Sequence, residues 1–194
     1  LYSWNDLGGA GAKGGGLIAS GRFLAGEAAA ESGPRDAPLD PLHGAWLFNA
    51  YNRWSLTLLN GAFAAMNGRI VRERVVSDFD VHFPFASKEL YFHAYGRSGF
   101  IEHQVLLPAE NALGYLWQFE KLLRGSDVVV GLATFKAFKG TRKLLWYSGT
   151  GLSFAIHVPA CPKSLAFLAE VDRLDLDHQA DDLLGGQAFQ QDPV

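Results

Sequence analysis

The sequence has almost no cysteine and no long apolar run, and each absence excludes a class of protein. Among 194 residues there is one cysteine, Cys161, so an internal disulfide framework and a cysteine-rich metal site are excluded. No run of about 18 apolar residues occurs, so we expect no transmembrane segment. The net charge is −3 and the basic residues are scattered, which argues against a nucleic-acid or anionic-membrane partner. We expect a cytoplasmic protein that associates with membranes only through its partners.

Several catalytic signatures are also missing. The six histidines fall at no spacing typical of a metal site, such as His-Glu-x-x-His, so we expect no metal. No Gly-x-Ser-x-Gly element predicts acyl transfer. The glycine-rich residues 8–16 lead into a predicted strand rather than a helix N-terminus, so they predict no phosphate-binding loop. Cys161, directly before Pro162, is interpreted as structural.

What is present is an ordinary globular composition, with 48% hydrophobic and 19% charged residues. Residues 1–45, rich in Gly, Ala and Pro, are interpreted as an N-terminal strand (within residues 17–26) and an exposed connection. Residues 46–178 form the main predicted domain, and residues 179–194 a C-terminal tail. Because the chain begins at Leu1 with no Met and no signal-peptide pattern, we expect a piece of a longer protein or a processed chain.

Hydrophobic periodicity predicts the elements of the main domain. Residues 46–67 predict a helix, and strands are predicted at 99–107, 127–138 and 151–158, with a hairpin partner near 144–148. Pro108 and Pro162 are each predicted to begin a helix. The apolar faces of the three helices are predicted to be Leu56, Leu59, Phe63 and Met66; Leu113, Leu116, Trp117 and Leu123; and Leu165, Leu168 and Val171. This order predicts an α+β fold: a mostly antiparallel sheet with helices on one face, in a split βαβ, ferredoxin-like layer.

Each of the three strands has one apolar and one polar face, because strand side chains alternate with a period of two. His103 is predicted to share the helix-covered face with Ile101 and Val105. The other face, here called the polar face, carries Glu102 and Gln104, Thr134 and Lys136, and Ser153 and His157.

The polar face has two interpretations. It could be a solvated sheet surface, which is common in antiparallel sheets, or it could line a ligand site in which Lys136 supplies a charge and Phe138 an apolar wall. Within it, Glu102 could be a general base, because closure of the sheet over a bound ligand would bury it and raise its pKa towards neutrality, or it could be an ion-pair partner of Lys136. His157 could be functional or a surface histidine.

Several segments carry a family resemblance. These are Tyr95-Gly96, Gly99-Phe100, Gln104 and Pro108; Lys136 to Phe138; residues 151–159; and the shorter stretches SWNDL, NRWSLTLLN and AEVDRL. Together they resemble the substrate (cap) domain of FAD-dependent oxidoreductases of the vanillyl-alcohol oxidase and p-cresol methylhydroxylase superfamily. Within that superfamily the chain is most similar to the branch of decaprenylphosphoryl-ribose 2′-oxidase and the aldonolactone oxidases.

The resemblance implies that Gln104, Lys136 and Phe138 lie beside the flavin ring and the substrate. It places His82 and Ser153 at positions that face the substrate or flavin. Together with the polar face, it makes Lys136 and Glu102 our catalytic candidates and His157 a further substrate- or flavin-facing residue. The chain departs from the family pattern where Glu102 replaces a Gln, His82 a Tyr, Ser153 an Asn and Ala155 a Cys. The lysine that the family carries after a Gly-Gly element is not found after Gly185-Gly186.

The resemblance also implies that FAD is bound mainly by a domain or subunit that would precede Leu1. We therefore expect a substrate-binding domain of an oxidoreductase that oxidises a sugar or other alcohol by hydride transfer to flavin, inactive without its FAD domain. The alternative is a non-catalytic paralogue that serves as a structural or interaction subunit of a larger complex.

Overall fold

The structure is a computed structural model that describes residues 1–7, 15–22, 24, 46–67, 75, 89–141, 149–178, 181–182 and 187–189. Its helices are α1 (Arg53–Asn67), α3 (Glu89–His93), α4 (Ala112–Arg124) and α5 (Pro162–Asp177). Its strands are β1 (Tyr2–Asn5), β2 (Gly16–Ala19), β3 (Phe100–Leu107), β4 (Leu132–Phe138), β5 (Gly151–Pro159), β6 (Asp181–Asp182) and β7 (Gln187–Phe189). None of these helices combines the length and the apolar character needed to cross a membrane.

The strands form one sheet in the order β2-β1-β4-β5-β3-β6, and β7 also pairs with β3. Every pairing is antiparallel. The strands β3 and β4, which α4 connects, are therefore parallel to each other with β5 between them. This is the split βαβ layer that the order of elements predicts, and the α+β class is confirmed.

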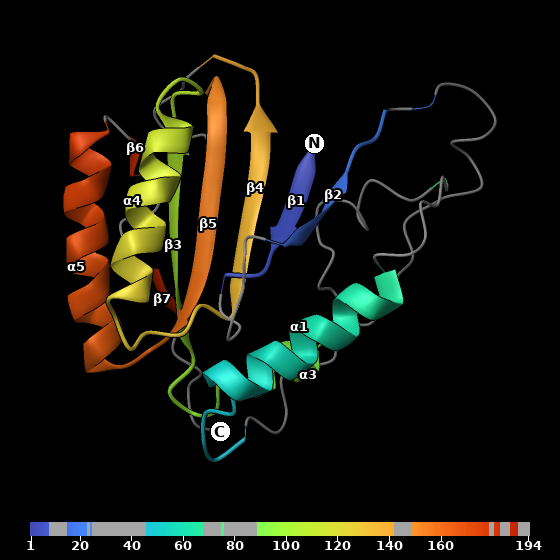
Figure 1. Ribbon diagram of the computed structural model, residues 1–194, viewed down its shortest axis with the longest axis vertical. Helices are drawn as coiled ribbons and strands as arrows, with labels where there is room; N and C mark the ends of the chain where they lie inside the picture. The colour runs from blue at the N-terminus through green and yellow to red at the C-terminus, as the bar shows by residue number, and fades with distance from the viewer. Residues whose placement is uncertain are drawn as a thin grey trace.

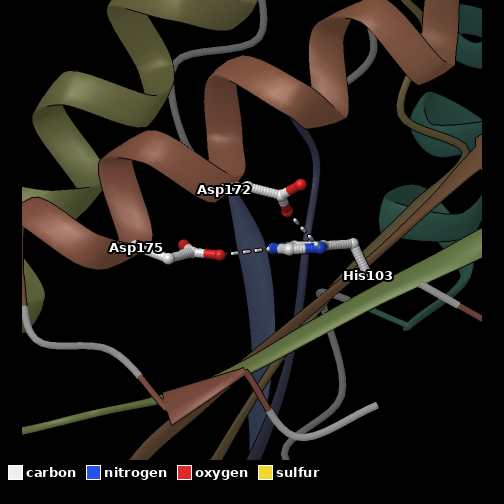
Figure 2. A group of neighbouring side chains, drawn as sticks. All are labelled: His103, Asp172 and Asp175. Atoms are coloured by element: carbon white, nitrogen blue, oxygen red, sulfur yellow. Dashed lines mark ion pairs between the residues drawn. The ribbon is translucent and has the colours of Figure 1, made fainter. Parts of the chain in front are cut away.

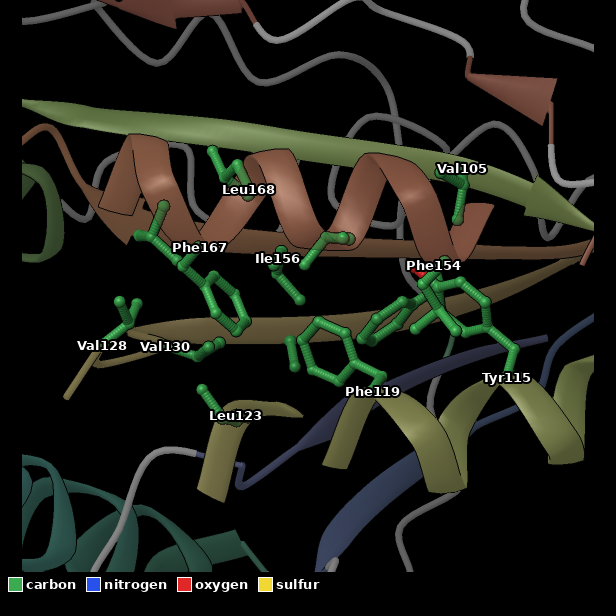
Figure 3. Packing of buried hydrophobic residues seen from close by; sticks show 14 of the residues in the cluster. Val105, Tyr115, Phe119, Leu123, Val128, Val130, Phe154, Ile156, Phe167 and Leu168 are labelled. Carbon is green, nitrogen blue, oxygen red and sulfur yellow. The ribbon is translucent and has the colours of Figure 1, made fainter. Parts of the chain in front are cut away.

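The helices α4 and α5 lie side by side on one face of the sheet (Figure 1). Between them and the sheet lies the main core, which includes Tyr115, Phe119, Phe154, Ile156, Phe167 and Leu168 (Figure 3). The other helices contact the sheet differently. Phe63 of α1 packs on Trp4 of β1, with ring centroids 4.8 Å apart, and Tyr91 of α3 hydrogen-bonds to His157 of β5. Both Trp4 and His157 point away from α4 and α5, so α1 and α3 reach the polar face.

The predicted inner faces of the helices are partly wrong. In α4 the buried residues are Ala112, Tyr115, Phe119 and Leu123, while Leu113 and Trp117 are exposed. Pro108 does not begin this helix: a turn follows it, in which the Asn111 N–H donates to the Pro108 carbonyl, and the helix begins at Ala112. Two adjacent apolar stripes exist on this helix, and periodicity alone does not choose between them.

The predicted inner faces of α5 and α1 are also partly wrong. In α5, which does begin at Pro162, Leu168 and Val171 are buried as predicted, but Leu165 is exposed and Phe167 takes its place. In α1 only Leu56 of the predicted stripe is buried; Leu59, Phe63 and Met66 are exposed.

The sheet contains more strands than the sequence predicts. Strand β1 was not predicted, yet it pairs with both β2 and β4. The strands β6 and β7 come from the predicted C-terminal tail. Strand β4 begins at Leu132 rather than near residue 127, and the predicted hairpin partner at 144–148 lies outside the described residues.

Candidate functional site

The structure gathers the predicted polar side chains on one face of the three central strands. Strand pairing places Glu102 opposite His157, Gln104 opposite Ala155, and Lys136 opposite Ser153. His103 points to the other face, towards α5, as the alternation predicts. The predicted division of the strands into an apolar and a polar face is therefore confirmed.

The polar face is not a solvated surface. Gln104, Thr134, Ser153 and His157 are all buried, so the interpretation as an ordinary water-exposed sheet face is wrong. The surface-histidine interpretation of His157 is wrong for the same reason. Because buried polar groups need partners, each of these side chains has to be accounted for by its contacts.

Glu102 and His157 form the pair at one end of this face. Oε2 of Glu102 lies 3.2 Å from Nε2 of His157, and the Glu102 side chain keeps 25% of its surface exposed. The hydrogen bond from His157 lowers the pKa of Glu102; burial opposes this, and the charges of His157 and Lys136 lower it further. The near partner of Glu102 is thus His157, while Lys136 acts on it through its charge.

Behind His157 runs a chain of hydrogen bonds through two phenols. Nδ1 of His157 lies 3.0 Å from the Tyr91 hydroxyl, which lies 2.9 Å from the Tyr95 hydroxyl. Burial is the largest cause that raises the pKa of both Tyr91 and Tyr95 well above its ordinary value, so both phenols keep their protons. These contacts suit both forms of His157: a charged ring donates from both nitrogens, whereas a neutral ring that donates from Nε2 to Glu102 accepts at Nδ1 from Tyr91.

Local packing fixes the position of these aromatic rings. Phe100 stacks on the His157 ring, with centroids 4.6 Å apart. The Tyr95 hydroxyl lies over Gly131, where a Cβ would come within 2.1 Å of it, so glycine leaves the space that this phenol needs. Gly96 has φ +69°, and a Cβ there would lie 2.6 Å from the backbone of Phe48.

Sequence reasoning did not identify Tyr91 and Tyr95 as site residues. A signal was available, because two tyrosines four positions apart fall on one face of a helical turn. Spacing along the sequence does not predict that α3 approaches β5, and this approach brings the two phenols to His157.

Gln104 and Ser153 form the middle of the polar face. The Gln104 side-chain amide donates to the Ser153 hydroxyl over 2.9 Å, and both side chains are buried. Lys136 is half-buried and lies at the level of Ser153. Lys136 and Ser153 are therefore paired positions on neighbouring strands, and Ser153 is hydrogen-bonded to Gln104 of the third strand, all on the polar face.

Phe138 lies on the polar face two residues beyond Lys136, and it pairs with Gly151. It is six residues, or roughly 20 Å along the strand, from the position opposite His157. Phe138 can therefore lie beside Lys136 but not beside the Glu102–His157 pair. His82 lies outside the described residues.

Comparison with known protein families and curated proteins does not identify a family for this chain. No model of a known protein family matches the chain, and no curated protein matches it.

Proposed function

We propose that the chain is the substrate-binding domain of an FAD-dependent oxidoreductase that oxidises a sugar or other alcohol. The proposal rests on one observation: three adjacent strands place a carboxylate, an imidazole, an ammonium and a side-chain amide on one largely buried face. A buried face that carries several ionisable groups is more typical of a ligand site than of structural packing. The family resemblance supplies the reaction class.

The Glu102–His157 pair suits removal of a proton from a substrate hydroxyl. Oxidation of an alcohol releases one proton from oxygen and one hydride from carbon. A lowered pKa keeps Glu102 ionised but makes it a weak base, so we propose that the hydrogen-bonded Glu102–His157 pair, rather than the carboxylate alone, takes up the proton. His157 holds that carboxylate in place, and Tyr91 fixes the histidine ring from its other nitrogen. Gln104, Ser153 and Lys136 would orient the substrate by donating hydrogen bonds.

The donor set also suits a flavin ring. An amide and an ammonium on a largely buried face match the carbonyl and ring-nitrogen acceptors of such a ring. The flavin, when bound, accepts the hydride. We propose that a separate domain or subunit holds most of the FAD, and that the chain acts as one part of a larger cytoplasmic complex.

The test is isolation of the native protein, tagged at its own locus, under conditions that keep complexes intact. We expect flavin absorbance in the purified material, on this polypeptide or on a chain bound to it, and loss of that absorbance when an oxidisable sugar or alcohol is added without oxygen. Glu102→Gln should slow the loss by about 10²–10⁴-fold, the usual contribution of a general base. Glu110→Gln, an exposed change on the turn before α4, is the matched control. A native complex with no flavin on any chain contradicts the proposal.

A non-catalytic interaction subunit is the second candidate, and one observation favours it. The outer face of α1 is apolar and exposed: Trp54 is 81% and Leu58 76% exposed, and with Thr57, Gly61 and Ala62 they line an open hollow of about 480 Å³. Exposed apolar patches of this kind mark interaction surfaces. The native isolation separates the two candidates, because a colourless chain held in a stable complex supports the interaction subunit.

A further inference from the structure

We propose that His103, Asp175 and Asp172 form a binding site for a divalent transition-metal ion between β3 and α5. The three side chains converge on the helix-covered face of the sheet, away from the polar face (Figure 2). One ligand atom from each lies within 4.8 Å of the others. This site is separate from the proposed oxidoreductase site and does not depend on it.

The strongest indication is a pair of buried atoms that make no hydrogen bond. Nε2 of His103 and Oδ2 of Asp175 are both buried and lie 3.0 Å apart as an ion pair (Figure 2), yet neither atom makes a hydrogen bond in the described part of the chain. The carboxylate oxygen therefore lies away from the N–H direction of the ring. A cation about 2.1 Å from both atoms, with a right angle between them, would separate them by roughly 3.0 Å. The separation thus matches two adjacent ligands of one ion.

The remaining contacts suit a metal site as well. The Tyr115 hydroxyl donates to the other oxygen of Asp175 over 2.7 Å, which fixes the carboxylate with Oδ2 towards His103. Outer contacts of this kind orient the ligands of metal ions. Oδ1 of Asp172 lies 3.8 Å from Nδ1 of His103, the ring nitrogen that would not bind the ion, and the Asp172 side chain is 62% exposed. One carboxylate oxygen of Asp172 nevertheless lies within 4.8 Å of the other two ligand atoms, so a turn of this side chain towards Nε2 would supply the third ligand.

The ligand chemistry selects the class of ion. One imidazole and two carboxylates suit Zn²⁺, Mn²⁺ or Fe²⁺, whereas Mg²⁺ and Ca²⁺ prefer oxygen ligands alone. Because the ligands come from β3 and α5, a bound ion would join the helix to the sheet and stabilise the folded state.

The experiment measures binding and thermal unfolding of the full chain after treatment with a chelator. Zn²⁺ is the probe and Mg²⁺ the comparison. We expect one Zn²⁺ per chain by calorimetry, and a rise in Tm of roughly 5–10 °C when free Zn²⁺ exceeds Kd about 100-fold. Mg²⁺ at the same concentration should leave Tm unchanged.

Variants locate the ion. Asp172→Asn removes a ligand at an exposed position that the fold tolerates, and should weaken Zn²⁺ binding at least about tenfold. His103→Gln should abolish it; if this buried change prevents folding, Asp172→Asn decides the question. Asp177→Asn, an exposed change on the same helix, is the matched control and should bind as the unaltered chain does. No Zn²⁺ binding, binding equal in Asp172→Asn and Asp177→Asn, or an equal Tm rise with Mg²⁺ would each overturn the proposal.

Discussion

Glu102 and His157 face each other across two antiparallel strands, with Oε2 of the carboxylate 3.2 Å from Nε2 of the ring. They come from positions 55 residues apart in the chain (157 − 102), and strand register alone brings them together. This pair determines how the polar face should respond to pH and to substitution.

The first prediction concerns the pH dependence of stability. The folded-state pKa of Glu102 lies below its ordinary value of 4.5, so its contribution to stability is complete above that pH and is lost as pH falls towards the folded-state pKa. Glu102→Gln should lower the free energy of unfolding by about 1–2 kcal/mol at pH 7, and by progressively less as pH falls below about 4.5. Urea unfolding at a series of pH values measures this. Glu110→Gln should change stability by less than about 0.5 kcal/mol throughout. A Glu102→Gln deficit that stays constant down to pH 3 contradicts the prediction.

The second prediction concerns the buried phenols. Burial raises the pKa of Tyr91, Tyr95 and Tyr115 well above 10, and the carboxylate of Asp175 adds to this at Tyr115. In an alkaline titration these tyrosines should ionise only as the protein unfolds, so their ultraviolet signal should change together with the circular dichroism. Reversible ionisation of all six tyrosines near pH 10, with the native circular dichroism retained, would show that these phenols are accessible.

The third prediction tests which face of α4 packs on the sheet. Phe119 is fully buried against Phe154, whereas Trp117, two residues earlier, is 67% exposed. Phe119→Ala should lower the free energy of unfolding by about 3–5 kcal/mol, and Trp117→Ala by less than about 1 kcal/mol. Chemical denaturation of the two variants measures the difference. A larger loss of unfolding free energy for Trp117→Ala than for Phe119→Ala would show instead that the face predicted from periodicity, which includes Trp117, packs on the sheet.

The fourth prediction tests the two faces of β3 through adjacent residues. Gln104 lies on the polar face and His103 on the helix face. If the proposed function holds, Gln104→Leu should weaken flavin retention in the native complex about tenfold or more, because a buried hydrogen-bonding group is lost. His103→Gln should change retention less than about twofold, although it lowers Tm. Equal effects on retention contradict the division of the two faces.

The helix faces mark where sequence reasoning fails. Alternation along β3, β4 and β5 is correct, because a strand has only two faces and one is clearly apolar. A helix offers a continuous surface, and α4 has apolar residues on more than one side of it. Which side turns inward depends on the point where the helix begins. The turn after Pro108 moves that point to Ala112.

The sequence by itself determined the fold class, the split βαβ order, and which side chains of each central strand share a face. These follow from local periodicity and from proline and glycine positions, which act over a few residues. The tertiary structure decided the burial of the polar face, the pairing of Glu102 with His157, and the approach of Tyr91 and Tyr95. It also decided the meeting of His103 with Asp172 and Asp175. Each of these depends on strand register or on the approach of a helix that is distant in sequence. Neither can be predicted from the spacing of residues along the chain.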